Sequence, residues 1–80
     1  MDDEKIIAQI SALADEERRL EEAHVGDELS EAERARLRAI EVTLDQLWDM
    51  LRQRRAKRDA GRSPEGVQPR SPETVEGYLQ

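Results

Sequence analysis

The chain has 80 residues, a formal net charge of −6 and no cysteine. This length allows one small domain, and the lack of cysteine excludes a disulfide framework and a thiolate metal site. No apolar run approaches membrane-spanning length, and the start Met-Asp-Asp-Glu-Lys is unlike a basic signal peptide, so we expect a cytoplasmic protein with no membrane partner. Charge is distributed unevenly, because residues 1–49 hold 15 acids and 6 bases whereas residues 50–62 hold 1 acid and 6 bases.

The first predicted element is a helix over about residues 3–24. Apolar or semi-apolar residues recur at positions 6, 10, 13, 17, 20 and 24, a 4-3 spacing typical of a coiled-coil-like seam. Glu17 interrupts this seam, and we expect it to form a buried polar pair across to the next helix. Arg36 is the chosen partner, with Arg34 and Arg38 also in reach; an unpaired buried acid with a raised pKa is the alternative.

A turn over about residues 25–30 separates this helix from a second one over about residues 31–60. Gly26 suits a left-handed backbone, and Ser30 with Glu33 forms the pattern of a capping box. The second helix repeats the 4-3 seam at positions 33, 37, 40, 44, 47, 51, 54 and 58, and Gly61 is placed to end it. Because the link is short, the two helices should pack as an antiparallel hairpin.

Residues 62–80 are predicted to form a flexible tail. Three prolines and few apolar residues favour an extended linker. Near its end, Val75, Tyr78 and Leu79 share one helical face, which indicates a short docking segment that orders only when a surface receives it. The domain organisation is therefore a hairpin over residues 1–61 followed by this tail.

The expected fold class is all-α, and self-association is part of the prediction. A two-helix hairpin buries little apolar surface relative to the chain entropy it loses, so a partner surface is expected. The simplest partner is a second copy, which would complete a four-helix bundle. The sequence leaves the relative orientation of the two hairpins open.

The candidate interaction surfaces lie late in the chain. The second helix should extend past the first, and its overhang carries most of the positive charge. Trp48 lies beside the seam, so it could extend the core, join a dimer core or form the floor for the docked tail. The candidate interaction residues are Trp48, Arg52, Arg54, Arg55, Lys57, Arg58, Val75, Tyr78 and Leu79.

These surfaces predict a non-catalytic protein–protein interaction or adaptor protein that acts as a dimeric helical bundle. The alternative is a nucleic-acid-associated regulator that uses the arginine-rich helix end, with Trp48 stacking on a base. The acidic remainder of the chain disfavours that alternative, because it repels phosphate.

Metal and catalytic motifs are weak. Glu21 and His24 have the spacing of a di-iron ligand pair, with Glu17 one turn earlier. A single histidine at a helix end is better explained as an exposed residue that suits the helix C-terminus. There is no glycine-rich phosphate loop and no Ser/His/Asp set. We therefore expect no metal, no cofactor and no enzymatic activity.

Two strings in the second half of the chain carry a resemblance. Residues 44–56 read LDQLWDMLRQRRA and residues 75–78 read VEGY, and Glu33, Arg36, Leu37 and Glu41 precede the first string. On these residues the chain resembles a family of short actinobacterial proteins catalogued as a domain of unknown function. The resemblance covers nearly the whole chain and implies a helical hairpin of bacterial, cytoplasmic origin. It implies no activity.

Overall fold

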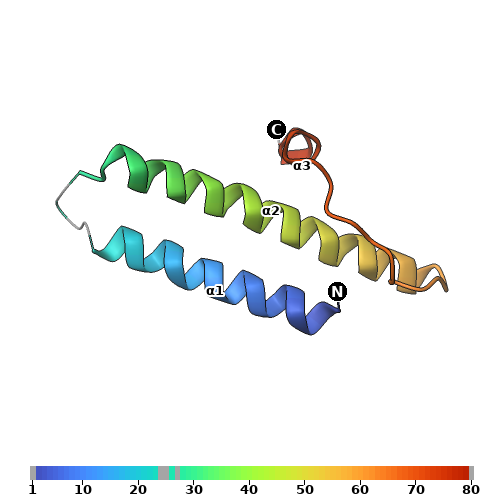
Figure 1. Ribbon diagram of the computed structural model, residues 1–80. Coiled ribbons are helices and arrows are strands. Elements are labelled where there is room, and N and C mark those ends of the chain that lie inside the picture. The colour runs from blue at the N-terminus through green and yellow to red at the C-terminus, as the bar shows by residue number, and fades with distance from the viewer. Residues whose placement is uncertain (1, 24–25, 27, 80) are drawn as a thin grey trace.

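Three helices make up the regular structure of the part of the chain that is described. The computed structural model describes residues 2–23, 26 and 28–79. Helix α1 spans Asp3–Glu22, α2 spans Glu31–Asp59 and α3 spans Pro72–Leu79. Helices α1 and α2 run antiparallel side by side, and α3 packs on α2, in a body of 50 × 25 × 16 Å (Figure 1). This confirms the predicted all-α class and the packing of helix against helix.

Local capping explains where the helices begin and end. The Asp2 carboxylate accepts a hydrogen bond from the Lys5 amide at the start of α1. Before α2, the Ser30 hydroxyl accepts from the Glu33 amide, and the Glu33 carboxylate accepts from the Ser30 amide, so the predicted capping box is present. At the starts of both α1 and α2, side-chain oxygens thus accept hydrogen bonds from amides that a helix leaves unpaired.

Glycine provides the stop of α2, as predicted. Gly61 has a φ of 74°, the left-handed conformation in which glycine is least strained. The Arg62 amide donates to the Lys57 carbonyl and the Gly61 amide donates to the Arg58 carbonyl, which together form a Schellman motif. This motif turns the chain sharply after α2 and sends the tail back along the same helix.

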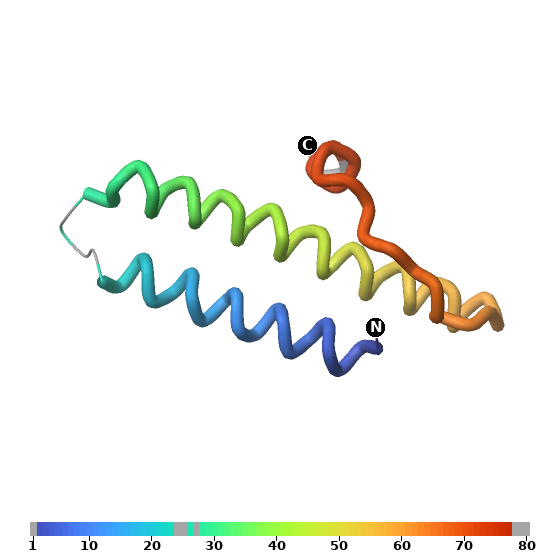
Figure 2. The backbone as a smooth tube through the Cα atoms, in the orientation of Figure 1, coloured from blue at the N-terminus to red at the C-terminus, as the bar shows by residue number. Residues whose placement is uncertain are grey.

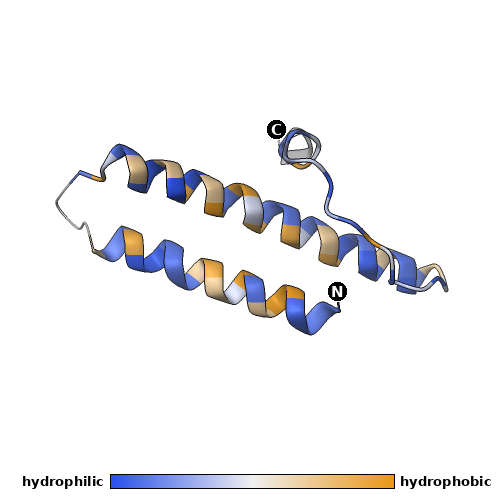
Figure 3. Cartoon of the chain, viewed as in Figure 1, coloured by the Kyte–Doolittle hydropathy of each residue, from blue (hydrophilic) through white to orange (hydrophobic). Residues whose placement is uncertain are grey.

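The core lies between α1 and the second half of α2. Ile6 and Ile10 of α1 pack with Leu47 and Met50 of α2. Hydrophobic and hydrophilic residues alternate along both long helices, as their mixed orange and blue colours show (Figure 3). Partly buried apolar residues pack around this cluster: Leu13, Leu44, Leu51 and Val67. Ile6 is fully buried, and burial of such a side chain contributes about 2 kcal/mol.

The tail, residues 62–79, lies along the hairpin, and α2 is the surface that receives its predicted docking segment. After Gly61 it runs back over the end of α2 that extends past α1, and it then forms α3 against the middle of α2 (Figure 2). Val67 packs against the core cluster, and Val75 of α3 is fully buried. These contacts offset the conformational entropy that a proline-rich chain loses when it becomes ordered.

Candidate interaction surface

Two stripes of side chains on α2 have different surroundings. The first stripe is covered by the tail, and we call it the closed face: Gln46, Asp49, Met50, Gln53 and Arg54. The second stripe is not covered by the tail, and with one residue of α1 we call it the open face: Ile7, Trp48, Leu51, Arg52 and Arg55. Each α2 stripe follows i, i+3, i+4, i+7 spacing, so each forms one side of the helix.

Arg54 is a buried connector rather than an exposed interaction residue. The residue is 4% exposed, although the sequence placed it on the basic overhang. Its Nε donates to the Asp3 carboxylate at the start of α1, and its Nη1 donates to the Pro64 carbonyl of the tail at 3.2 Å. One guanidinium therefore ties together α1, α2 and the tail, which corrects the prediction that Arg54 serves a partner.

Arg58 shares the same acid. Its Nη2 donates to Asp3 Oδ2 at 2.8 Å, on the opposite carboxylate oxygen from Arg54. The hydrogen bond from Arg58, and then the one from Arg54, lower the pKa of Asp3 below its ordinary value. Two of the five predicted basic interaction residues thus already hold a carboxylate within the chain.

Polar contacts fix the tail on the closed face. Asp49 is 3% exposed, and its carboxylate lies 3.4 Å from Arg70 Nε of the tail. Gln53 Nε2 donates to the same carboxylate at 2.8 Å, and Gln46 Nε2 donates to the Arg70 carbonyl at 2.9 Å. The floor of the docked tail is therefore this stripe and not Trp48, which corrects that option for the tryptophan.

One contact between α2 and α3 brings two acids together. The hydrogen bond that links the Glu76 and Asp45 carboxyl groups raises the pKa of Glu76, and repulsion from Asp45 and Glu41 acts in the same direction. A carboxyl pair of this kind is held best when one member carries a proton. Docking of α3 therefore carries a dependence on pH.

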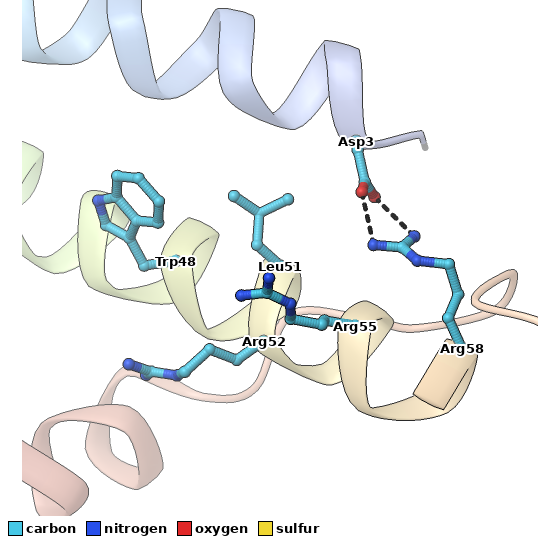
Figure 4. Close-up of a pocket in the computed structure, with 6 residues that line it drawn as sticks. All are labelled: Asp3, Trp48, Leu51, Arg52, Arg55 and Arg58. Atoms are coloured by element: carbon cyan, nitrogen blue, oxygen red, sulfur yellow. Dashed lines mark hydrogen bonds and ion pairs between the residues drawn. The ribbon is translucent and has the colours of Figure 1, made fainter. Parts of the chain in front are cut away.

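The open face contains a cavity of about 350 Å³ at the first turn of α1. It is lined by Asp3, Trp48, Leu51, Arg52, Arg55 and Arg58 (Figure 4). Trp48 is 51% exposed, so the option that it extends the core is wrong. Arg55 makes no ion pair within the described residues, and Arg52 lies 3.7 Å from Asp49. The cavity thus joins the Trp48 ring to two guanidinium groups, Arg52 with a long contact to Asp49 and Arg55 with no ion pair to a described residue.

A second exposed apolar side chain lies on the α1 side of this cavity. Ile7 is 54% exposed and follows Asp3, which lines the cavity, by one helical turn on the same face of α1. Ile7 and Trp48 are the large hydrophobic residues that the described chain leaves most exposed. Ile7 and Asp3 were not among the predicted site residues. Antiparallel pairing about the turn sets residue 3 opposite residue 51, and this pairing could have placed Asp3 at the site from the sequence alone.

The predicted buried pair between Glu17 and Arg36 is wrong in partner and in burial. Arg36 donates from Nε and Nη2 to the two oxygens of Glu16, both at 2.7 Å. The side chains are 50% and 34% exposed, so this bidentate pair lies at the surface. The hydrogen bond from Arg36 lowers the pKa of Glu16. Glu16, which lies next to the seam, therefore reaches across to α2, and Glu17, which lies within the seam, is not the paired acid.

Lys57, Tyr78 and Leu79 are the remaining candidate interaction residues. Lys57 is half-buried beside the tail-covered end of α2 and makes no ion pair in the described part of the chain. Tyr78 and Leu79 belong to α3, but their side chains lie outside the described residues, as does His24. Among the described residues no group of three or more His, Cys, Asp or Glu could hold a metal ion, and no helix could span a membrane.

Fold and surface together define an all-helical hairpin whose C-terminal tail closes one face of its longer helix. The chain belongs to the family described as "Protein of unknown function (DUF2630)", whose model matches residues 2–80. It is similar to uncharacterised proteins of Mycobacterium tuberculosis and Mycobacterium bovis, each 45% identical over 78 residues that cover 95% of this chain and 88% of the relative. No solved structure matches the chain. The family resemblance seen in the sequence is thereby confirmed.

Proposed function

We propose that the protein is a non-catalytic interaction or adaptor protein of the cytoplasm that works as a dimeric helical bundle and binds through its open face. One observation carries this proposal. Trp48 is about half exposed beside Arg52 and Arg55, in a cavity wide enough for an apolar side chain. Tryptophan and arginine are the side chains most enriched among residues that dominate protein interfaces.

The chemistry of the cavity supports binding rather than catalysis. Its single carboxylate, Asp3, accepts hydrogen bonds from Arg58 and Arg54, and its lowered pKa makes it a poor proton acceptor. Arg55 offers a planar set of donors that suits a carboxylate. The surface therefore favours a partner that presents an apolar side chain next to an acid.

Comparison of two single variants in the native host tests the proposal. Full-length tagged protein is purified in parallel with Trp48→Ser, which removes the exposed ring, and with Arg38→Ser, an exposed residue of α2 outside the cavity. We expect partners to be recovered with the wild type and with Arg38→Ser and lost with Trp48→Ser. Equal recovery with all three proteins would overturn binding through the open face.

A nucleic-acid role is the second candidate, and the placement of Trp48 beside Arg52 and Arg55 favours it specifically. An aromatic ring flanked by guanidinium groups can stack a base and hold a phosphate. However, Arg54 and Arg58 are occupied by Asp3, and the chain has a net charge of −6. If phosphate contacts from Arg52 and Arg55 dominate, affinity for a single-stranded oligonucleotide should fall about sevenfold between 50 and 200 mM salt. Absence of binding at 50 mM salt would exclude this role.

A further inference from the structure

The open face has an apolar centre drawn from both long helices. Ile7 projects from α1 and Trp48 from α2, and both are more than half exposed. Leu51 is partly buried beneath them, between the core cluster and the cavity. On α2 the tail covers a different side, so it leaves this centre open. The described residues therefore leave this centre uncovered.

The charges around this centre have opposite signs on the two helices. On the α2 side lie Arg52 and Arg55, and Arg55 makes no ion pair within the described residues. On the α1 side lies Glu4, which is exposed and precedes Ile7 by three residues on adjoining turns. Over the described residues 2–23, α1 and its caps hold 8 acids and 3 bases. The surface is thus basic on one edge and acidic on the other.

A surface with this layout is complementary to itself. In a two-fold dimer the same patch is used by both copies, so each basic edge must meet an acidic edge. A two-fold axis parallel to the long axis of the hairpin places α1 of one copy over α2 of the other without changing their level. Asp3 lines the cavity together with Arg55, so the first turn of α1 is level with that arginine.

From this layout we infer that the occupant of the open face is the open face of a second copy. Trp48 of each copy packs on Ile7 of the other, and Arg55 of each copy pairs with Glu4 of the other. The result is a four-helix bundle with the two tails on its outer sides. This inference rests on the proposed function and names the partner at the same surface.

Charge reversal in two separate variants tests the pairing. Arg55→Glu alone and Glu4→Arg alone each set two pairs of like charges against one another in a homodimer. An equimolar mixture restores both pairs, because the heterodimer contains one native contact between positions 55 and 4 and one in which the two charges are exchanged. Sedimentation equilibrium should give a dimer dissociation constant at least about tenfold higher for each variant alone and within about threefold of the wild type for the mixture.

Two further measurements keep the outcomes distinct. Trp48→Ser should weaken the dimer at least about tenfold, since it removes an aromatic anchor from the centre of the interface, and circular dichroism of each variant should show that helix content is unchanged. A mixture no better than its components would overturn the Arg55–Glu4 pairing. A wild type that stays monomeric at high micromolar concentration would overturn the second-copy inference. That result would also remove the dimeric bundle from the proposed function. Binding of another partner through the open face would then be decided by the native-host comparison, in which loss of partners with Trp48→Ser is the supporting result.

Discussion

Arg54 and Arg55 are neighbours in the chain and have opposite surroundings. Arg54 is almost fully buried and bonds to α1 and the tail, whereas Arg55 lines an open cavity and makes no ion pair in the described residues. Successive helical residues point about 100° apart, so one step along α2 crosses from the closed face to the open face. The contrast teaches that one arginine-rich run can supply both a buried structural contact and a guanidinium group exposed on an open surface.

The two faces also differ in how completely their polar groups are satisfied. Among the described residues, no buried side-chain nitrogen or oxygen lacks a hydrogen-bond partner. On the closed face this is achieved by Asp49, Gln53 and Gln46, which bond to one another or to the tail. The open face instead keeps a half-exposed aromatic ring and a guanidinium that no acid of the described residues pairs with. A closed face of this kind favours one conformation, and an open face of this kind favours association.

The largest expected effect is the loss of Arg54. Arg54→Ala should lower the free energy of unfolding by about 3 kcal/mol, because a buried ionic contact is broken and the Pro64 carbonyl loses its donor. Arg55→Ala is the matched control, and its effect should stay within about 0.5 kcal/mol. Urea unfolding at the lowest workable protein concentration, where association contributes least, measures both. Equal losses would show that the two faces do not differ as described.

Helix positions and ends were predictable from the sequence because they depend on local patterns. The 4-3 seam, the Ser30 capping box and the Gly61 stop each involve residues within about one or two turns of one another. The structure places α2 at Glu31–Asp59, close to the expected 31–60. The first helix ends earlier than expected, at Glu22.

The closed face was not predictable by the same reasoning. Asp49 and Arg54 are charged, so periodicity assigns them to solvent, and Met50 is an isolated apolar residue beside the seam. Their partners, Arg70 and the Pro64 carbonyl, lie in an extended segment that has no period of its own. Trp48, a predicted candidate, is half exposed, and Ile7, which lies outside the 4-3 seam and was not a candidate, is equally exposed.

A smaller effect is expected where α3 meets the closed side of α2. Because the pKa of Glu76 is raised, its charged form opposes docking at neutral pH, and protonation relieves this as pH falls through the folded-state pKa. Glu76→Gln should therefore raise the melting temperature slightly at pH 7, and the gain should vanish below about pH 4.5, where the wild-type carboxyl is protonated in both states. Exposed Glu73→Gln is the control. A gain that persists at low pH would contradict this cause.

The smallest effect is expected at the Glu16–Arg36 pair, which spans the hairpin where the tail does not cover it. Solvent screens this exposed pair, in contrast to the buried Arg54 contact, so its contribution to stability is small. Because the pKa of Glu16 is lowered, the contribution is present above about pH 4.5 and is lost as pH falls through the folded-state pKa. Glu16→Gln should lower the melting temperature slightly at low salt and not in about 1 M NaCl, where charges are screened within about 3 Å. Glu17→Gln is the matched control. A larger decrease in melting temperature with Glu17→Gln than with Glu16→Gln would show that Glu17, the acid in the seam, makes the ion pair that spans the hairpin.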